Sequence, residues 1–316
     1  MSYSFTRSDT AVWAAAGGVQ AKSMRTRHQC IAAIVGAHQD PAYPYNRHVP
    51  ELPEVETVAR QLAPLLTGRI ITGVELFDPL LKKRPVPRLE GRAIETVRRL
   101  GKQVLFSFSG APLHLAVHLR MTGRLIYEPD VKPSTPCHLR ARLSLDRGRL
   151  HFIDTRRFGT FTWAADLARL APVGLDPFST EFTPLALARL VAKSPTALKV
   201  WLLRQDKLVG VGNIYASEIC YVARLSPFRA AGSLRRAEIE ALYEATLAVL
   251  SRAIDNSGTT FSDFQDAYGL TGSYQRYLGV YERAGEPCQR CNTPIKRRTQ
   301  AQRSTYWCPG CIARAR

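Results

Sequence analysis

Four cysteines near the C-terminus have the spacing of metal ligands. Cys288 and Cys291 form one Cys-x-x-Cys pair, Cys308 and Cys311 form a second, and sixteen residues separate the pairs. Two such pairs suit a tetrahedral Zn2+ ion, because each tight turn presents two thiolates. Four thiolates leave no open coordination position, so the pattern predicts one structural zinc ion rather than a catalytic metal. Redox-active or incidental pairs are the alternative.

The segment between the cysteine pairs could form a basic hairpin. It reads NTPIKRRTQAQRSTYW, which is long enough for two short strands, and its cations are Lys296, Arg297, Arg298 and Arg303. A ribbon this small needs its metal to fold. Exposed cations on such a ribbon favour contacts with DNA phosphates, although a zinc ribbon can also bind a protein partner.

The whole chain carries a large positive charge. Among its 316 residues, 44 Lys and Arg oppose 26 Asp and Glu, for a net charge of +18. Such an excess favours a polyanionic partner, most often nucleic acid, although some arginine-rich proteins bind none. The 45% of hydrophobic residues can form a core, which argues against global disorder. No apolar run approaches the roughly eighteen residues of a transmembrane helix. The seven cysteines show no disulfide framework, which indicates a reducing compartment.

The elements that would position these groups change along the chain. Apolar residues at spacings of three and four predict a helix from Pro53 to Gly68, with Glu54 and Glu56 at its positive end. Short alternating stretches separated by turn signals follow at residues 70–77, 103–110, 113–121, 138–145 and 149–156. This pattern predicts an antiparallel sandwich and not repeated strand–helix units.

After a Pro-rich linker, the pattern becomes helical. Apolar periodicity predicts helices within residues 185–194, 196–205, 213–225 and 233–254. The stretch GVGN, which ends at Asn213, has glycines for a tight turn. The helix that follows would aim its backbone N–H groups at an anion.

Four motifs occur in one order along the chain. They are PELPEVETVAR from Pro50, RRLGK with HLRMTG in the sheet region, KLVGVGNIYASE in the helical region and AQRSTYWC in the ribbon. Together they resemble the formamidopyrimidine-DNA glycosylase family of bacterial enzymes, from Pro50 to about Ile312. The resemblance implies excision of oxidised purines, such as 8-oxoguanine and formamidopyrimidines, with strand cleavage by β,δ-elimination. It also implies double-stranded DNA with oxidised bases or abasic sites as partner, a monomer, no membrane, and a cytoplasmic location at the bacterial nucleoid.

The fold class implied is α+β and multidomain. An N-terminal antiparallel β-sandwich flanked by helices would precede a helical helix–two-turn–helix domain with a C-terminal zinc ribbon. The expected boundaries are a catalytic sandwich at 50–166, a linker at 167–184, a DNA-binding helical domain with a lid loop at 185–282 and the ribbon at 283–316. Residues 1–48 are expected to be a disordered or mis-annotated extension, and an organellar targeting segment is the minor alternative.

The position of Pro50 raises a question about the start of the chain. In the family the initiating methionine is removed, and the proline amine attacks the sugar C1′ and expels the damaged base. Here Val49 takes the place of the methionine, and valine is the literal translation of a GTG start codon. Within a longer peptide the nitrogen of Pro50 would be an amide with a delocalised lone pair, so it could not act as the nucleophile. We therefore expect translation to begin at Val49.

The resemblance also assigns roles to matching residues. The implied catalytic residues are Pro50, Glu51, Glu54, Lys102 and Arg303. The implied DNA-binding residues are His118, Met121, Arg156, Phe158, Asn213, Lys199 and Glu218. Each also has an ordinary interpretation, such as helix capping for the first-turn glutamates and the asparagine, or core packing for the histidine, methionine and phenylalanine.

These implied roles fall into groups. Glu51 would transfer a proton at the sugar, with Glu54 as a supporting acid. The phosphates that flank the lesion would be held by Lys102, His118, Asn213 and Arg303. The hole left by the extruded nucleotide would be filled by Met121, Arg156 and Phe158. Near the damaged base would lie Lys199 and Glu218, with residues 263–283 as a lid.

Two rival functions stay open. The endonuclease VIII branch excises oxidised pyrimidines with the same proline chemistry and usually begins Pro-Glu-Gly-Pro-Glu. Here Leu52 takes the place of the glycine, which favours the purine branch. The other rival is a DNA-binding protein without catalysis, which would follow if residues 1–49 are retained.

Overall fold

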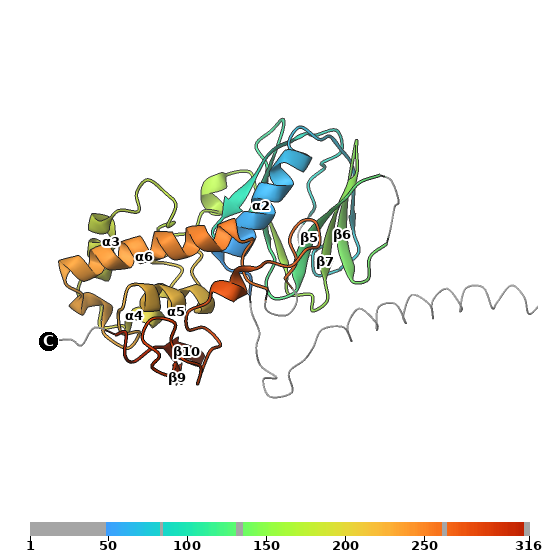
Figure 1. Ribbon diagram of the computed structural model, residues 1–316. Coiled ribbons are helices and arrows are strands. Elements are labelled where there is room, and N and C mark those ends of the chain that lie inside the picture. Colours follow the sequence, from blue (N-terminus) through green and yellow to red (C-terminus); the bar gives the residue numbers. More distant parts are fainter. Residues whose placement is uncertain (1–48, 83–84, 131–134, 261–263, 313–316) are drawn as a thin grey trace, which may run out of the picture. The chain divides into compact units, whose positions relative to one another are not determined.

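The arrangement of the elements is given by a computed structural model, which describes residues 49–82, 85–130, 135–260 and 264–312 (Figure 1). The expectations for residues 1–48 therefore lie outside the described residues. Apart from Thr135–Cys137, the described residues belong to one unit of the chain. Among them, no helix is both long enough and apolar enough to cross a membrane.

Helix α2 (Leu52–Leu66) follows directly on Pro50 and Glu51. Pro53 is tolerated in the first turn, where its missing N–H would have no helical partner. Gly68 follows the helix with a φ of 82°, the left-handed conformation that ends many helices. The buried stripe of the helix packs into the sandwich core and consists of Val55, Val58, Ala59, Leu62 and Leu66. The predicted helix is thus confirmed.

Two antiparallel sheets of four strands form the sandwich (Figure 1). One sheet has the strand order β1-β6-β7-β5, and the other has the order β2-β3-β4-β8. The strands are β1 (Ile71–Leu76), β2 (Ile94–Leu100), β3 (Gln103–Phe108), β4 (His114–His118), β5 (Gly123–Glu128), β6 (Leu139–Leu145), β7 (Arg149–Asp154) and β8 (Thr160–Ala164). Apolar side chains from both sheets share one core, which confirms the predicted sandwich.

The sequence patterns predict β1, β3, β4, β6 and β7 but miss the other three strands. Strand β2 shows why, because it lies at the edge of its sheet. Only Ile94 and Val97 of this strand are buried, and charged residues occupy several of its other positions. Two buried positions give too weak an alternation to mark a strand.

The helical domain contains α3 (Pro184–Val191), α4 (Leu198–Leu202), α5 (Asn213–Val222) and α6 (Arg236–Asp255). Short 3-10 turns occur at Leu167–Arg169, Ala231–Ser233 and Tyr274–Tyr277. Helix α6 packs against α2, α3 and α5 (Figure 1). Its buried face contains, as predicted, Ile239, Leu242, Val249 and Leu250. Leu234 differs, because it precedes the helix and is only partly buried.

The C-terminal ribbon is a hairpin of β9 (Lys296–Gln300) and β10 (Arg303–Trp307). Ala301 and Gln302 form its turn with φ angles of 46° and 60°, as a tight hairpin with matching twist requires. Apolar residues of the ribbon join the core of the helical domain, namely Cys288, Ile295, Tyr306 and Cys308. The predicted hairpin is present, and it shares its core with the helices.

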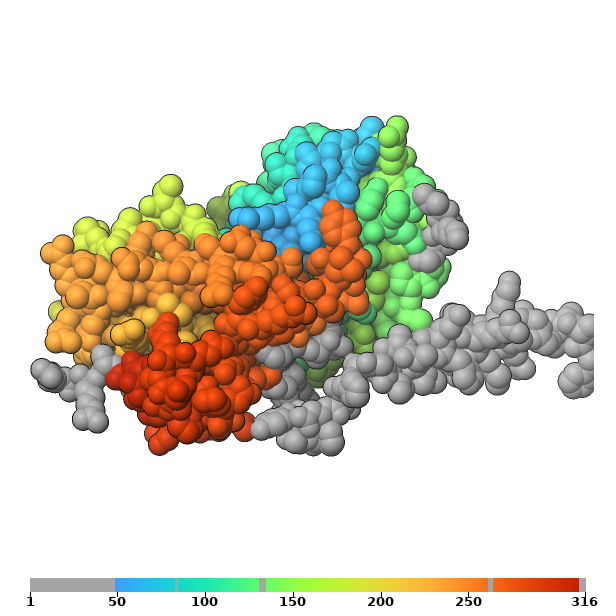
Figure 2. All heavy atoms as spheres, in the orientation of Figure 1, coloured from blue at the N-terminus to red at the C-terminus, as the bar shows by residue number. Residues whose placement is uncertain are grey.

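Each domain also contributes residues to the core of the other. Leu52, at the start of α2, lies in the core of the helical domain. Phe264 and Ala267, after α6, lie in the sandwich core. The Gln61 amide of α2 fixes this crossing segment, since it donates to Asp266 Oδ2 at 2.9 Å and accepts from the Ala267 N–H at 3.0 Å. Figure 2 shows the orange atoms of this segment against the blue atoms of α2.

Candidate active site

The junction of Pro50 and Glu51 is buried at the N-terminus of α5. The Glu51 carboxylate accepts hydrogen bonds from the backbone N–H groups of Gly212, Ile214 and Tyr215 at 2.7, 3.0 and 3.4 Å. A Cβ on Gly212 would lie within 2.7 Å of Glu51 Cγ, so only glycine leaves room for this contact. The anion that the sequence predicts at this helix N-terminus is therefore Glu51 in the structure.

Glu51 has the electrostatic properties of a proton-transfer group. Burial raises the pKa of its carboxyl, Lys102 opposes that rise, and Glu54 adds to it. A raised pKa brings a carboxyl closer to the proton affinity that general acid–base chemistry near neutral pH requires. The three N–H donors fix the direction of the carboxylate at the same time.

Glu54 is a buried acceptor that joins three segments. Its Oε2 accepts the Glu51 N–H at 2.9 Å, as in a helix cap. Its Oε1 accepts the Tyr215 hydroxyl at 2.5 Å and the N–H and hydroxyl of Thr259 at 2.7 and 2.9 Å. Tyr215 and Thr259 were not expected from the sequence, because partners about 160 and 200 residues away leave no local pattern. The position of Glu54 is compatible with both interpretations of this residue, namely a helix cap and a supporting acid for Glu51.

Lys102 lies in the turn between β2 and β3. Its ammonium donates to the carbonyl of Val211, just before α5, at 3.1 Å. Burial lowers the pKa of Lys102, Glu51 opposes this effect, and Arg303 reinforces it. Lys102 of the sandwich therefore interacts electrostatically both with Glu51, at the start of the first helix, and with Arg303 of the ribbon.

His118 ends strand β4 and is uncharged at neutral pH. Burial, together with the neighbouring charges of Arg120 and Lys102, lowers its pKa to about 4. The Arg120 N–H donates to Nδ1 of the ring at 3.0 Å. Because Nδ1 is an acceptor, the proton of the neutral ring is on Nε2. His118 can therefore offer one neutral N–H donor to a phosphate, but no positive charge.

Lys199 lies at a joint between α4, α5 and the ribbon, with a relative exposure of 1%. Its ammonium donates to Asn213 Oδ1 at 2.6 Å, to the Ser304 carbonyl at 2.7 Å and to Thr305 Oγ1 at 3.0 Å. These bonds use all three donors of a lysine. Burial lowers the pKa of Lys199 to about 8. In this conformation Lys199 orients Asn213 and Ser304, and Ser304 follows the exposed Arg303. The ammonium of Lys199 then has no donor left for DNA.

Met121, Arg156 and Phe158 lie together, as the resemblance implied. The Arg156 guanidinium lies 4.9 Å from the Phe158 ring centroid, and its Nη1 is 3.6 Å from Met121 Sδ. Phe158 is 49% exposed. The loop beneath is held by Asp154, which accepts the N–H groups of Arg156 at 3.2 Å and of Gly159 at 2.8 Å.

Glu218 lies on α5, and its hydrogen bonds are made to residues 279–281. It is 2% exposed and accepts the N–H groups of Gly279, Val280 and Tyr281 at 2.8, 3.0 and 2.8 Å. The carboxylate thus fixes the segment that enters the ribbon to α5. A role beside the damaged base is not suggested by these contacts.

Comparison with known proteins agrees with this arrangement. Residues 49–161 match the formamidopyrimidine-DNA glycosylase N-terminal domain, residues 173–265 match the formamidopyrimidine-DNA glycosylase H2TH domain, and residues 285–314 match a zinc finger found in FPG and IleRS. The formamidopyrimidine-DNA glycosylase of Chloroflexus aurantiacus is 42% identical over 273 residues, which are 83% of this chain and 97% of that protein. This chain belongs to the formamidopyrimidine-DNA glycosylase family.

Solved structures of the family are similar along the same part of the chain. The MutM (Fpg) protein of Thermus thermophilus is 40% identical with a TM-score of 0.73, over 83% of this chain and 98% of that one. A Lactococcus lactis Fpg variant in complex with DNA containing Fapy-dG is 30% identical, with a TM-score of 0.73 over 84% and 100% of the two chains. Wild-type Lactococcus lactis Fpg with DNA containing an oxidised pyrimidine is 31% identical, with the same TM-score and coverage.

Members of the formamidopyrimidine-DNA glycosylase family are DNA repair glycosylases with AP lyase activity, so this chain is an enzyme. Its ribbon also has the family's metal centre. The ligand atoms of Cys288, Cys291, Cys308 and Cys311 all lie within 4.8 Å of one another, which fits a tetrahedral Zn2+ ion. The Tyr221 hydroxyl lies 3.4 Å from Cys288 Sγ and links this centre to α5. The predicted structural zinc site is confirmed.

Proposed function

We propose that this enzyme excises oxidised purines, such as 8-oxoguanine and formamidopyrimidines, from double-stranded DNA and then cuts the strand by β,δ-elimination. The nucleophile is the amine of Pro50, in a chain that begins at that residue. The main support is the buried Pro50–Glu51 junction, with Glu51 fixed on the α5 N-terminus and Lys102 beside it. The complex of a Lactococcus lactis relative with Fapy-dG DNA supports the same class of lesion.

The reaction would begin with attack of the Pro50 nitrogen on C1′ of the damaged nucleotide. The new C–N bond forms as the glycosidic bond breaks, and the base leaves with a proton. Glu51 exchanges a proton at the sugar ring, for which its raised pKa is suited. The nitrogen lone pair then expels O4′, which takes a proton from Glu51, and the ring opens to an iminium. The iminium acidifies C2′, and loss of a C2′ proton expels the 3′ phosphate. A second elimination expels the 5′ phosphate.

Phosphates on either side of the lesion would be held by groups from three parts of the fold. Lys102 and Arg303 supply positive charge, and His118 supplies a neutral N–H donor. Asn213 is oriented by Lys199, which donates to its Oδ1. Its Nδ2 amide donates to the Tyr281 hydroxyl at 3.3 Å and to the Ser304 carbonyl at 3.2 Å, so a phosphate would replace one of these two acceptors. Phosphate contacts of this kind fix the register of the DNA without reading its sequence. Met121, Arg156 and Phe158 would fill the gap left by the extruded nucleotide.

The chain start at Pro50 is part of the proposal. The match to the family's N-terminal domain begins at residue 49, and 83% of this chain corresponds to 97% of the Chloroflexus aurantiacus protein. A form that begins at Pro50 would therefore be close in length to this relative. With residues before Pro50 attached, its nitrogen is an amide and the enzyme would bind DNA without catalysis.

Excision of oxidised pyrimidines is a second candidate, because a Lactococcus lactis relative was solved with such a lesion. The two candidate functions are distinguished by the cleavage rates of matched duplexes that contain 8-oxoguanine or an oxidised thymine. We expect the purine duplex to be cut at least about tenfold faster, a difference of about 1.4 kcal/mol in the barrier. Faster cleavage of the pyrimidine duplex would reverse the assignment, and binding without cleavage of either duplex would refute the enzymatic proposal.

A further inference from the structure

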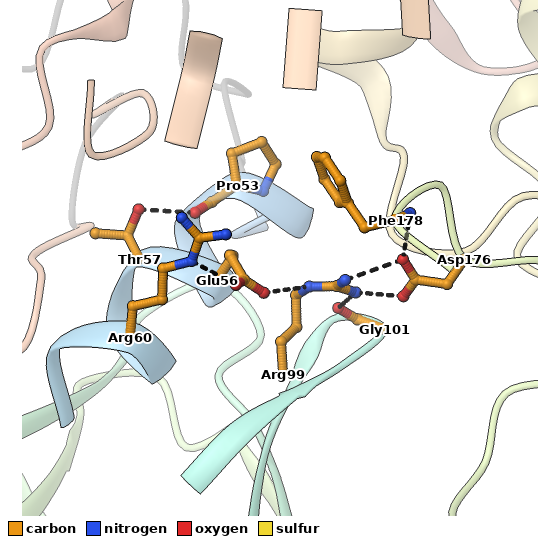
Figure 3. Close-up of polar contacts among 8 residues, drawn as sticks. All are labelled: Pro53, Glu56, Thr57, Arg60, Arg99, Gly101, Asp176 and Phe178. Carbon is orange, nitrogen blue, oxygen red and sulfur yellow. Dashed lines mark hydrogen bonds and ion pairs between the residues drawn. The ribbon is translucent and has the colours of Figure 1, made fainter. Parts of the chain in front are cut away.

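One buried arginine bonds to three segments around the candidate active site (Figure 3). The side chain of Arg99, near the end of β2, is only 7% exposed. Its Nε donates to Glu56 Oε2 of α2 at 2.8 Å. Its terminal nitrogens donate to the two carboxylate oxygens of Asp176, in the linker, at 2.6 and 3.0 Å. Nη1 also donates to the carbonyl of Gly101 in the β2–β3 turn at 3.3 Å.

Asp176 is itself fixed to the helical domain. Its carboxylate also accepts the Phe178 N–H at 2.9 Å, which holds the linker in a local turn (Figure 3). The preceding residue, Leu175, accepts a backbone hydrogen bond from Val209 at 2.9 Å and forms a bridge with Leu208. Arg99 therefore reaches, through one short stretch of linker, the segment that leads into α5.

The turn that carries Lys102 meets this segment a second time. Gly101 approaches Val209 so closely that a Cβ on the glycine would lie 2.9 Å from Val209 Cγ1. Lys102 then donates to the carbonyl of Val211 at 3.1 Å. The β2–β3 turn is thus attached at two points. Arg99 joins it to the linker through Asp176, and the ammonium of Lys102 joins it to the segment before α5.

We propose that Arg99 is a positioning residue for the reaction. By bridging Glu56 and Asp176 it holds the Lys102 turn at a fixed place between the start of α2, which carries Glu51, and the segment before α5. The inference rests on the proposed function, since it gives Arg99 a role only through Lys102 and Glu51. Because its side chain is only 7% exposed, Arg99 would act through these residues and without contact to the DNA.

The geometry requires arginine and not merely a positive charge. A guanidinium is planar and presents its donors in a fixed fork, so one side chain can bind a carboxylate with two parallel bonds and a second carboxylate with its Nε. A lysine at this position keeps the charge but has a single nitrogen, which cannot reproduce the bridge. The same Glu56 offers a matched control, because Arg60 binds its other oxygen at 2.7 Å but is 62% exposed and contacts no linker residue in the structure described.

The test compares Arg99→Lys with Arg60→Lys in the enzyme that begins at Pro50. Two quantities are measured: the Kd for a duplex with a tetrahydrofuran abasic analogue, and the single-turnover rate of strand cleavage on a duplex with a true abasic site. For Arg99→Lys we expect the rate to fall about 10- to 100-fold, as small misplacements of catalytic groups do, while Kd changes by less than about threefold. For Arg60→Lys we expect both to stay within about twofold of wild type.

Three results would overturn the inference. They are a cleavage rate for Arg99→Lys within about threefold of wild type, a Kd that weakens as much as the rate falls, or an equal loss in Arg60→Lys. If Arg99→Lys does not fold, Asp176→Asn decides by the same criteria, because it keeps the Arg99–Glu56 pair and weakens only the linker contact. A wild-type enzyme that fails to cleave the abasic duplex refutes the proposed function instead, so the two failures are distinguishable.

Discussion

Substitution of Gly212 by alanine should slow base excision, because the new methyl group displaces the side chain of Glu51. Gly212 has φ −129° and ψ −158°, an extended conformation that alanine adopts without strain. The added Cβ would lie within 2.7 Å of Glu51 Cγ and closer still to the carboxyl group, where ordinary contact begins at 3.4 Å. Glu51 must therefore retreat by about 0.7 Å or more and weaken its three bonds to the α5 N-terminus.

The size of this effect follows from those contacts. Hydrogen bonds to a charged group contribute about 1.5–3 kcal/mol each, so losing one or two should destabilise the fold by about 1.5–6 kcal/mol. A displacement approaching 1 Å at a catalytic group should lower the excision rate by about 100-fold. Single-turnover excision of 8-oxoguanine and thermal unfolding measure the two effects.

Gly73→Ala is the matched control for Gly212→Ala. Its Cβ would lie 3.8 Å from Ser144 Cβ, an ordinary contact far from Glu51 in the fold, so rate and stability should stay close to wild type. If Gly212→Ala excises 8-oxoguanine at the control's rate, Glu51 is not held in the way the structure indicates, and its assigned role in proton transfer loses its support.

Further perturbations test the zinc centre, the phosphate contacts and a titrating histidine. Cys288→Ser or Cys308→Ser should release zinc, unfold the ribbon and abolish DNA binding while the sandwich stays folded, and metal analysis that finds no zinc in the native protein would contradict this. Lys102→Ala or Arg303→Ala should weaken binding to damaged and undamaged DNA alike, and should flatten the slope of log affinity against log salt by about one unit; a loss confined to damaged DNA would argue against phosphate contact. His118 has a pKa of about 4 in the fold, below its ordinary 6.5, so it lowers stability progressively as pH falls from 6.5 towards 4. His118→Gln should make unfolding free energy less pH-dependent in that window, and an unchanged pH dependence would contradict the buried, neutral state.

The features that the sequence predicts well have local causes. The zinc ligands were predictable because a Cys-x-x-Cys turn fixes two thiolates by itself, and the hairpin between the pairs needs only its own length. Helix α2 was predictable from its apolar spacing, since that stripe faces the core wherever the helix packs. The residues implied by the family motifs form groups in the structure for Glu51 with Lys102, and for Met121 with Arg156 and Phe158.

The features that could not be predicted depend on partners far along the chain. GVGN indicates a helix N-terminus that awaits an anion, but nothing local says that the anion is Glu51, 161 residues earlier. Lys199 and Glu218 were expected near the damaged base because of family position. In the structure both residues are buried, and their hydrogen bonds to the ribbon and to the segment before it depend on the packing of α4 and α5, which no local sequence pattern reports.

The Arg99 bridge was invisible for a related reason. Its sequence context, RRLGK, has three charged residues at the end of an edge strand and in the turn after it, which is typical of a solvated surface. Only the approach of the linker residue Asp176 and of Glu56 on α2 makes the site buried. A sequence pattern reports the period of one element, and it carries no information about which neighbouring element covers it.

The free amine of Pro50 is the claim on which the account rests, and covalent trapping tests it most directly. The chain is made with methionine in place of Val49 as its first residue, so that removal of the methionine exposes Pro50, and it is mixed with 8-oxoguanine duplex and borohydride. We predict a reduced enzyme–DNA adduct whose mass spectrum locates the DNA on Pro50, and no adduct from a chain that keeps residues 1–49. An adduct on another residue, or one formed by the intact longer chain, would contradict the assignment of the nucleophile.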